Sequence, residues 1–250
     1  TTEWVGKLGA KPLPEIATED VLAALKPYWK SRPETGRRLR MRIEAVLDAA
    51  KARGHIPDPW SNPARWKGHL QHLLEKHTRP PKHHPALPYA EMSEFIGQLR
   101  AKDTMSARAL EFTVLTAART SETIYATWAE VDLGEKVWTI PAARMKARKV
   151  HRVPLSDAAL AVLEAVKPPD GYTPASWVFP SLWRAGKPLS TSAMERALQD
   201  LGYDHVTVHG MRSSFRDWAG DATNFARETV EAALAHVSGD ETERAYRRGD

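Results

Sequence analysis

Four prolines set close together divide this chain of 250 residues, and they stand in the stretch TRPPKHHPALP at Pro80, Pro81, Pro85 and Pro88. A proline lacks the backbone N–H and clashes with the preceding helical turn, so no long helix crosses this stretch and it should be stiff and extended. The chain also exceeds the usual length of one domain. We therefore predict a first domain at residues 1–79, a linker at 80–88 and a second domain at 89–250.

Composition limits the classes of protein to which this chain can belong. Lys and Arg total 36 against 31 acidic residues, a basic balance that permits a nucleic-acid partner. Cysteine is absent, which excludes disulfides, thiol nucleophiles and cysteine zinc sites and fits a reducing cytoplasm. No apolar run approaches the roughly 18 residues of a membrane span, so no membrane partner is expected.

Helical patterns fill the first domain. Thr18 precedes EDVLAALKPYW, Pro33 opens PETGRRLRMRIEAVLDAAKARG, and Asn62 with Pro63 precedes ARWKGHLQHLLEK. We predict a small helical bundle. Basic residues outnumber acidic ones between Tyr28 and His55, so one face should be positive. The candidate DNA contacts on that face are Arg37, Arg38, Arg40 and Arg42.

The second domain reads as helices around a small sheet. ALEFTVLTAA is apolar enough for a buried helix, and TWAEVDL, KVWTIP and VHRVPL read as short strands. Helical patterns resume with SDAALAVLEAV, STSAMERALQDLG, HGMRSSFRDWA and ETVEAALAH. The predicted fold class is therefore mainly α with a small antiparallel β-sheet (α+β). The tryptophans of this domain are expected in its core: Trp128, Trp138, Trp177, Trp183 and Trp218.

Two arginines could each serve structure or chemistry. In HGMR, His209 and Arg212 lie three residues apart and so share a helix face, which Thr207 could cap. The structural alternative has His209 bonded to a carbonyl and Arg212 paired with Asp217. Arg119 follows a buried helix, where it could clamp carbonyls or carboxylates, or bind a phosphate with two donors.

A basic stretch, AARMKARKVHR, separates two predicted strands and contains no acid. Its cations are Arg144, Lys146, Arg148, Lys149 and Arg152, which form either a solvated turn or a surface for a polyanion. The histidines near His69 lack the HExxH pattern, and neither GxxxxGK[ST] nor GxGxxG occurs. No metal and no nucleotide cofactor is therefore predicted.

Taken in order, these residues resemble the signature of the tyrosine recombinase (phage integrase) family: Arg, Lys, HxxR, His or Trp, and Tyr. The words LTAARTSE, WTIPAARMKARKVHRVPLS, VFPS, HGMRSSFRDWA and LAHV followed by AYRR are similar to the prophage and genomic-island integrase branch. Ser121 stands where many relatives have glycine. The resemblance covers nearly the whole chain and gives the catalytic set Arg119, Lys146, His209, Arg212, His236 and Tyr246.

That resemblance implies roles for these residues. Tyr246 attacks a DNA phosphodiester and leaves a 3′-phosphotyrosyl bond, without ATP or another cofactor. Arg119 and Arg212 neutralise the phosphate, and Lys146 is the general acid, with Arg144, Arg148 and Lys149 as alternatives and as DNA contacts. His209 resembles the acid/base or phosphate-binding histidine, His236 the last phosphate ligand, and Glu122 a support of the site.

The resemblance also implies an architecture and partners. A helical core-binding domain and a catalytic domain should clamp duplex DNA at attachment sites, as a homotetramer on DNA and a monomer when free. Accessory DNA-bending proteins or an excisionase are expected, and an amino-terminal arm-binding domain is expected to be absent from this chain. The function implied is integration or excision of a prophage or genomic island. The alternatives are a relaxer resembling type IB topoisomerases and a regulator that binds DNA without cutting it.

Overall fold

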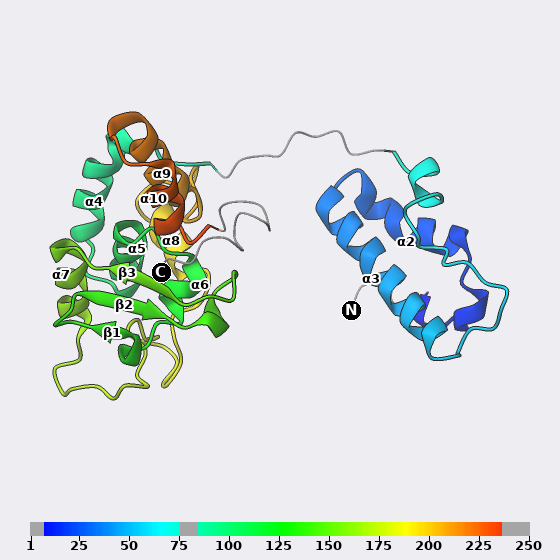
Figure 1. Cartoon of the computed structure of the whole chain (residues 1–250), viewed down its shortest axis with the longest axis horizontal. Coiled ribbons are helices and arrows are strands. Elements are labelled where there is room, and N and C mark those ends of the chain that lie inside the picture. The colour runs from blue at the N-terminus through cyan, green and yellow to red at the C-terminus, as the bar shows by residue number, and fades with distance from the viewer. Residues whose placement is uncertain (1–7, 76–84, 237–250) are drawn as a thin grey trace. The chain divides into compact units, whose positions relative to one another are not determined.

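The computed structural model of the chain describes residues 8–75 and 85–236. The chain divides into two compact units, Thr1–Lys82 and His83–Asp250 (Figure 1). Each unit has a hydrophobic core of its own. Helices make up most of the regular structure, and the described strands form one three-stranded antiparallel sheet. The predicted fold class, mainly α with a small antiparallel sheet, is confirmed.

Two long helices frame the first unit: α2 (Thr18–Trp29) and α3 (Pro33–Ala52). Pro33 starts α3, where its missing N–H removes no hydrogen bond. The helices approach closely at Gly36, because a Cβ there would lie 3.2 Å from the Trp29 ring. Single 3-10 turns lie at Leu13–Glu15 and Leu70–His72.

The third helix predicted for the first unit, in ARWKGHLQHLLEK, is wrong. The segment folds as turns with one 3-10 turn, because Gly68 has a φ of 73° that breaks the helical path. Side-chain contacts hold the segment instead. The Asn62 amide donates to the Glu44 carbonyl (2.9 Å) and to Asp48 Oδ1 (2.7 Å), so the loop is attached to α3.

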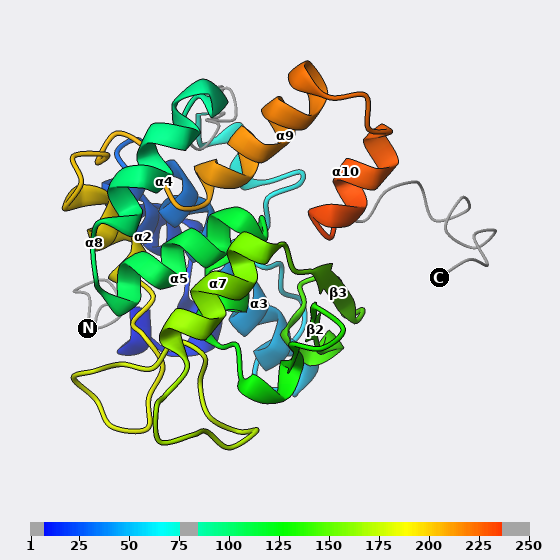
Figure 2. The same ribbon diagram turned by 90° about the vertical axis from the view of Figure 1, so that its left-hand side faces the viewer.

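Along the chain, the helices of the second unit come both before and after the three strands. Before it come α4 (Met92–Arg100), α5 (Met105–Leu115) and α6 (Thr120–Ile124), with a 3-10 turn at Tyr89–Glu91. After it come α7 (Asp157–Val166), α8 (Ala193–Gln199), α9 (Gly210–Ala222) and α10 (Arg227–Ala233). Helices α5 and α7 lie side by side (Figure 2), and α5 also contacts α8.

The sheet has the order β1 (Val131–Asp132), β2 (Val137–Ile140) and β3 (His151–Pro154). Register pairs Trp138 with Val153 and Ile140 with His151, and Trp138 and Ile140 point into the core. The strand predicted across TWAEVDL is shorter than expected, because Trp128–Glu130 forms a 3-10 turn first. A further 3-10 turn, Ala142–Arg144, follows β2.

The core of the second unit centres on large aromatic side chains. The ring of Phe112 lies 5.2 Å from that of Trp138 and 5.5 Å from that of Phe179, and all three are fully buried. Trp128 is also buried, as expected. The expectation is wrong for Trp183, which is 94% exposed, and for Trp218, which is 40% exposed. Both lie on segments whose backbone is fixed by contacts that do not involve the indole.

Candidate active site

Arg119 lies between α5 and α6, after a turn in which Ala117 has a φ of 48°. The Arg119 backbone N–H donates to Glu122 Oε2 (2.8 Å), and its guanidinium Nη1 donates to Glu122 Oε1 (2.7 Å). The Glu122 side chain is almost fully buried, so this carboxylate holds the guanidinium in one orientation. The sequence allowed Arg119 to bind a carboxylate, and this ion pair with Glu122 is also what positions its guanidinium.

Arg212 lies in the first turn of α9 and is buried. Its Nη1 donates to the Ala117 carbonyl and its Nη2 to the Leu234 carbonyl (2.5 Å), acceptors that replace the possible pairing with Asp217. Thr207 Oγ1 accepts from the Gly210 N–H (2.9 Å) at the start of α9, although His209 and not Thr207 is the N-cap residue. Carbonyls from two distant segments therefore fix one guanidinium.

The two guanidinium groups meet at the carboxyl end of α10. Arg119 Nη2 lies 3.4 Å from the carbonyl oxygens of both Leu234 and Ala235, and Arg212 Nη2 donates to the same Leu234 oxygen. The pKa of Arg212 is lowered to about 10, mainly by burial and also by the nearby Arg119, while Glu122 opposes both. Arg212 therefore stays cationic at neutral pH, and we name Arg119 and Arg212 together the arginine pair. Two partly desolvated cations this close favour a shared anion, such as a phosphate.

His236 follows α10 and reaches the same point. Its Nε2 lies 3.4 Å from Arg212 Nη2, and its Nδ1 lies 2.6 Å from Glu231 Oε2. Although partial burial acts to raise the pKa of Glu231, the hydrogen bond with His236 and the nearby Arg216 lower it overall, so Glu231 is ionised. A proton on Nδ1, shared with Glu231, leaves Nε2 available beside the arginine pair.

Comparison with known protein families gives two matches, which together cover most of the chain. Residues 86–250 match the phage integrase family, and residues 2–69 match the phage integrase central domain. The chain belongs to the phage integrase family. This confirms the family that the order of the motifs predicted.

Relatives and a solved structure agree with this membership. Prophage integrase IntA of Escherichia coli (strain K12) is 34% identical over 247 residues, 97% of this chain and 57% of IntA. The integrase of Enterobacteria phage P4 is 30% identical over 258 residues, 96% of this chain and 56% of that protein. The chain thus spans little more than half the length of these relatives. A lambda integrase tetramer bound to a Holliday junction has the same fold, with a TM-score of 0.65 at 18% identity over 95% of this chain and 71% of that one.

In this member of the phage integrase family, a second histidine lies at the arginine pair. The sequence did not lead us to predict it. His151, the first residue of β3, is half-buried. Burial lowers its pKa, and so do Arg119 and Arg212, whereas Glu122 and a hydrogen bond with the Ala233 backbone act to raise it. Alternation along VHRVPL was the available signal, since it puts His151 on the same face as the buried Val153.

The basic stretch between β2 and β3 separates into outward and inward side chains. Lys146, Arg148 and Lys149 are exposed, and Arg148 has a φ of 56°. Arg144 turns inward: its Nη2 donates to the Glu122 carbonyl (2.7 Å) and lies 3.3 Å from Glu130 Oε2. Arg144 therefore attaches this stretch to α6 beside the site, and we no longer count it among the DNA contacts.

The two other predicted catalytic residues are His209 and Tyr246. His209 precedes α9 and is exposed, one helical turn before Arg212. Tyr246 lies outside the described residues. Contacts of side chains thus join Arg119, Glu122, Arg212 and His236 into one site, with His151 beside it.

The predicted basic face of α3 also divides into two sets. Arg37, Arg38 and Arg42 are exposed, with Arg38 paired to Glu34 at 2.9 Å. Arg40 is turned inward: its Nη1 donates to Glu44 Oε2 (2.5 Å) and to the Ala64 carbonyl (2.8 Å), and its guanidinium lies 5.7 Å from the centre of the Trp66 ring. Arg40 is thus engaged within the unit, and we exclude it from the proposed DNA contacts.

Two further properties concern residues 8–75 and 85–236. None of their helices is both long and apolar enough to cross a membrane. Their His, Asp and Glu side chains form no group of three or more that is suited to a metal ion.

Proposed function

We propose that this chain cuts and rejoins duplex DNA at specific sites through a 3′-phosphotyrosyl intermediate, and so integrates or excises a prophage or genomic island. One observation carries the proposal: Arg119 and Arg212, from different elements, converge on one oxygen next to His236. Membership in the phage integrase family supports it, as do relatives named as prophage integrases. A protein that only bound DNA would gain nothing from this convergence.

The reaction exchanges one phosphoester for another. The phenol oxygen of Tyr246 forms a bond to phosphorus while the bond from phosphorus to the 5′-oxygen breaks. The phenol gives its proton to a base, and the departing 5′-oxygen takes one from an acid. Because the new ester stores the bond energy, no ATP is needed, and rejoining is the same step in reverse.

The arginine pair acts on the charge that gathers on the nonbridging phosphate oxygens. Each guanidinium has five N–H donors, and carbonyls or Glu122 accept only some of them. A phosphate can bind the donors that remain, or take the place of the Leu234 carbonyl. Since both groups are already oriented, little reorganisation is needed when the phosphate enters.

Histidine and lysine side chains supply the other parts of the reaction. We assign Lys146, which is exposed on the stretch between β2 and β3, as the general acid that protonates the 5′-oxygen. His236, with Nδ1 bonded to Glu231, would bind the phosphate by donating from Nε2–H in its doubly protonated form. His209, at the start of α9, is the further acid/base or phosphate-binding histidine.

The proposed partner is duplex DNA carrying attachment sites, held by residues 1–79 as core-binding domain and by residues 89–250 as catalytic domain. The solved lambda integrase tetramer on a Holliday junction supports a tetramer on DNA for this chain. DNA-bending proteins or an excisionase would then choose the direction of the reaction.

A nicked duplex tests this proposal directly. The duplex is taken from the ends of the mobile element that carries the gene, after footprinting has located the bound site. We expect the wild-type protein to form a covalent adduct that survives denaturing electrophoresis, and Tyr246→Phe to bind equally well without an adduct. An undiminished adduct from Tyr246→Phe would overturn the nucleophile. Binding by wild type without any adduct would indicate a regulator, and relaxation by a monomer without strand exchange would indicate a topoisomerase-like enzyme.

A further inference from the structure

The loop at residues 180–189 presents a tryptophan to solvent on a fixed backbone. Ser181 N–H donates to the Lys187 carbonyl (2.8 Å), and Leu189 N–H donates to the Phe179 carbonyl (3.1 Å). The Trp177 indole N–H donates to the Gly186 carbonyl (3.1 Å). This ordered loop nevertheless leaves Trp183 94% exposed and Leu182 76% exposed. A large aromatic side chain held in water by its loop is a candidate contact for a partner.

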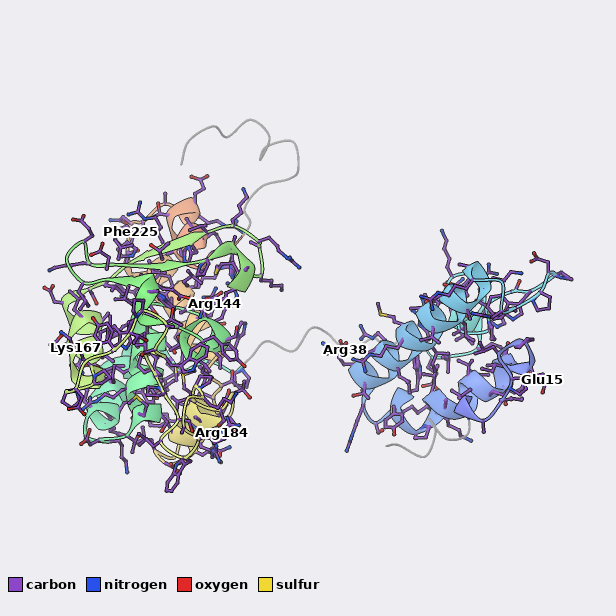
Figure 3. The ribbon with its side chains drawn as sticks, turned by 90° about the horizontal axis from the view of Figure 1, so that it is seen from below. Glu15, Arg38, Arg144, Lys167, Arg184 and Phe225 are labelled. Atoms are coloured by element: carbon purple, nitrogen blue, oxygen red, sulfur yellow. The ribbon has the colours of Figure 1, made fainter. Side chains whose placement is uncertain are left out.

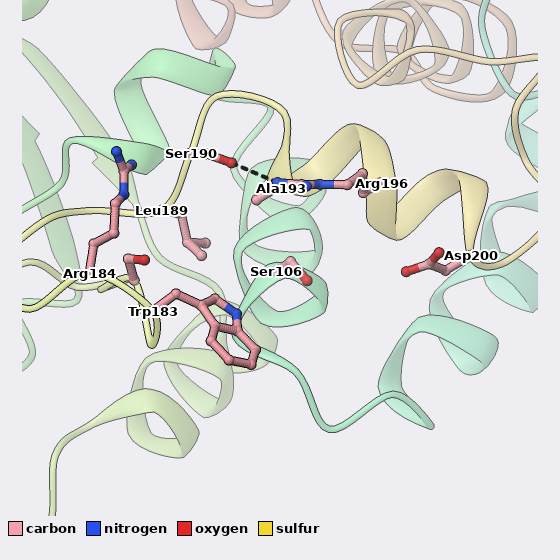
Figure 4. A pocket seen from close by; sticks show the side chains of 9 residues that line it. Ser106, Trp183, Arg184, Leu189, Ser190, Ala193, Arg196 and Asp200 are labelled. Atoms are coloured by element: carbon pink, nitrogen blue, oxygen red, sulfur yellow. Dashed lines mark hydrogen bonds between the residues drawn. The ribbon is translucent and has the colours of Figure 1, made fainter.

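A hollow of about 440 Å³ lies beside this loop, between it, α5 and α8 (Figure 4). Hydroxyl and cationic groups line it together with the indole. Arg196 Nη2 donates to Ser190 Oγ at 3.1 Å, and Ser106 lies on the same side of the loop as the Trp183 ring. Asp200 is the one acid among the residues that line it.

We propose that this surface is a second DNA contact of the catalytic unit, separate from the arginine pair. It comprises Leu182, Trp183, Arg184, Lys187, Ser190 and Arg196, and we name it the Trp183 patch. Arg184, Lys187 and Arg196 are exposed cations suited to backbone phosphates, and Ser190 adds a hydroxyl donor. The indole would pack on a deoxyribose or a base edge, so the occupant is the duplex that the proposed function requires.

Helix α8 connects the Trp183 patch to the active site. Glu195 Oε1, next to Arg196, accepts from the Val208 N–H (3.2 Å) just before the HGMR segment. Thr113 Oγ1 contacts Met194 Sδ of α8 (3.2 Å) and donates to Thr123 Oγ1 of α6 (2.9 Å), the neighbour of Glu122. The helix that carries Arg196 therefore contacts α5 and the segment just before α9, which both adjoin residues of the active site.

Affinity and its dependence on salt test the Trp183 patch. On the footprinted attachment-site duplex, we expect Trp183→Ala to weaken binding about tenfold, the effect of losing one large apolar contact. Trp183→Phe should recover part of the loss. Arg184→Ala with Arg196→Ala should lower the slope of log affinity against log salt by about 2, since each lost phosphate contact accounts for about 0.9. The control is Phe225→Ala, another exposed aromatic of the same unit (61% exposed), which lies at the opposite end from Arg184 in Figure 3.

The outcomes separate this inference from the proposed function. Trp183→Ala at saturating protein should still form the covalent adduct, because the arginine pair is untouched. Unchanged affinity and slope in both patch variants would overturn the inference and leave the recombinase proposal standing. A change in the oligomeric state of the patch variants in the absence of DNA would also overturn the inference, because the patch would then contact a second copy of the chain. Loss of the wild-type adduct would instead overturn the proposed function.

Discussion

Arg212 shows how a cation can be prepared for a phosphate before the phosphate arrives. Its two outer nitrogens already donate to carbonyl oxygens, and burial has removed most of its water. The cost of desolvating the guanidinium is therefore met during folding and not during the reaction. A lysine keeps the charge but has neither the planar fork nor the same reach.

Arg212→Lys should therefore slow cleavage far more than it weakens DNA binding. We expect the single-turnover rate of adduct formation on the nicked duplex to fall about 10²- to 10³-fold, the usual cost of one fixed donor to a transition state. Arg227→Lys, at an exposed arginine at the start of α10, is the matched control and should react at the wild-type rate. Equal rates for both variants would contradict the role of Arg212.

His151 should make the second unit less stable in mild acid. Its pKa is lowered from 6.5 in the folded state, mainly by burial, so the unfolded chain binds more protons just below pH 6.5. Stability then rises with pH through this window and is lost as the pH falls through the folded pKa. His151→Gln should flatten this fall in urea unfolding measured from pH 7 to 5. His205→Gln, at an exposed histidine of the same unit, should keep the wild-type slope.

At the scale of single residues, the sequence predicted which residues form the site better than it predicted whether a side chain points inward or outward. The order of Arg119, HGMR and LAHV was enough to name the residues that now meet at α10. Nothing in RRLRMR or AARMKARK showed that Arg40 and Arg144 turn inward, because buried acceptors on distant segments decide this. His151 was missed because its site forms only when β3, α6 and α10 come together.

Helix α9 depends on one glycine at its start. A Cβ at Gly210 would collide with the carbonyl of Pro85, an oxygen that also accepts from the Thr207 N–H (3.1 Å). The chain at Pro85 thus packs directly on the backbone of α9. Since Arg212 is two residues on, any shift of this start would also move the guanidinium.

Gly210→Ala should destabilise the second unit by about 1–3 kcal/mol, the usual cost of overpacking against backbone. The same substitution at Gly220, later in α9, meets nothing within 4 Å and should instead stabilise by about 0.5–1 kcal/mol. Urea unfolding followed by tryptophan fluorescence compares the two variants directly. Equal stabilities would mean that the contact with Pro85 yields without cost.

Elements with strong local signals were predicted well. Pro33 and the apolar spacing located α3, and Ser156, whose Oγ accepts from the Ala159 N–H (3.2 Å), caps the predicted α7. The third helix of the first unit failed because the left-handed backbone of Gly68 and the anchoring of Asn62 outweigh helical spacing. The exposure of Trp183 was equally hidden, since hydrogen bonds of its loop, and not burial of its ring, fix the backbone there.

Across the whole molecule, the proposed function gives different tasks to the two compact units. The first unit offers Arg37 and Arg42 as exposed cations of α3, whereas the arginine pair lies wholly within the second. Binding and chemistry should therefore separate by mutation. This separation is the physical basis for expecting a clamp, because one unit can hold DNA while the other cuts it.

Replacing Arg37 and Arg42 together by alanine should lower the slope of log affinity against log salt by about 2, since about 0.9 is lost per phosphate contact. Adduct formation at saturating protein should stay at the wild-type rate, because no group of the arginine pair has changed. Arg40→Ala is the contrasting variant: it removes the contacts with Glu44, Ala64 and Trp66, so it should destabilise the first unit. If the double variant kept the full slope, α3 would not lie on the phosphates, and the first unit would have to hold DNA by another face.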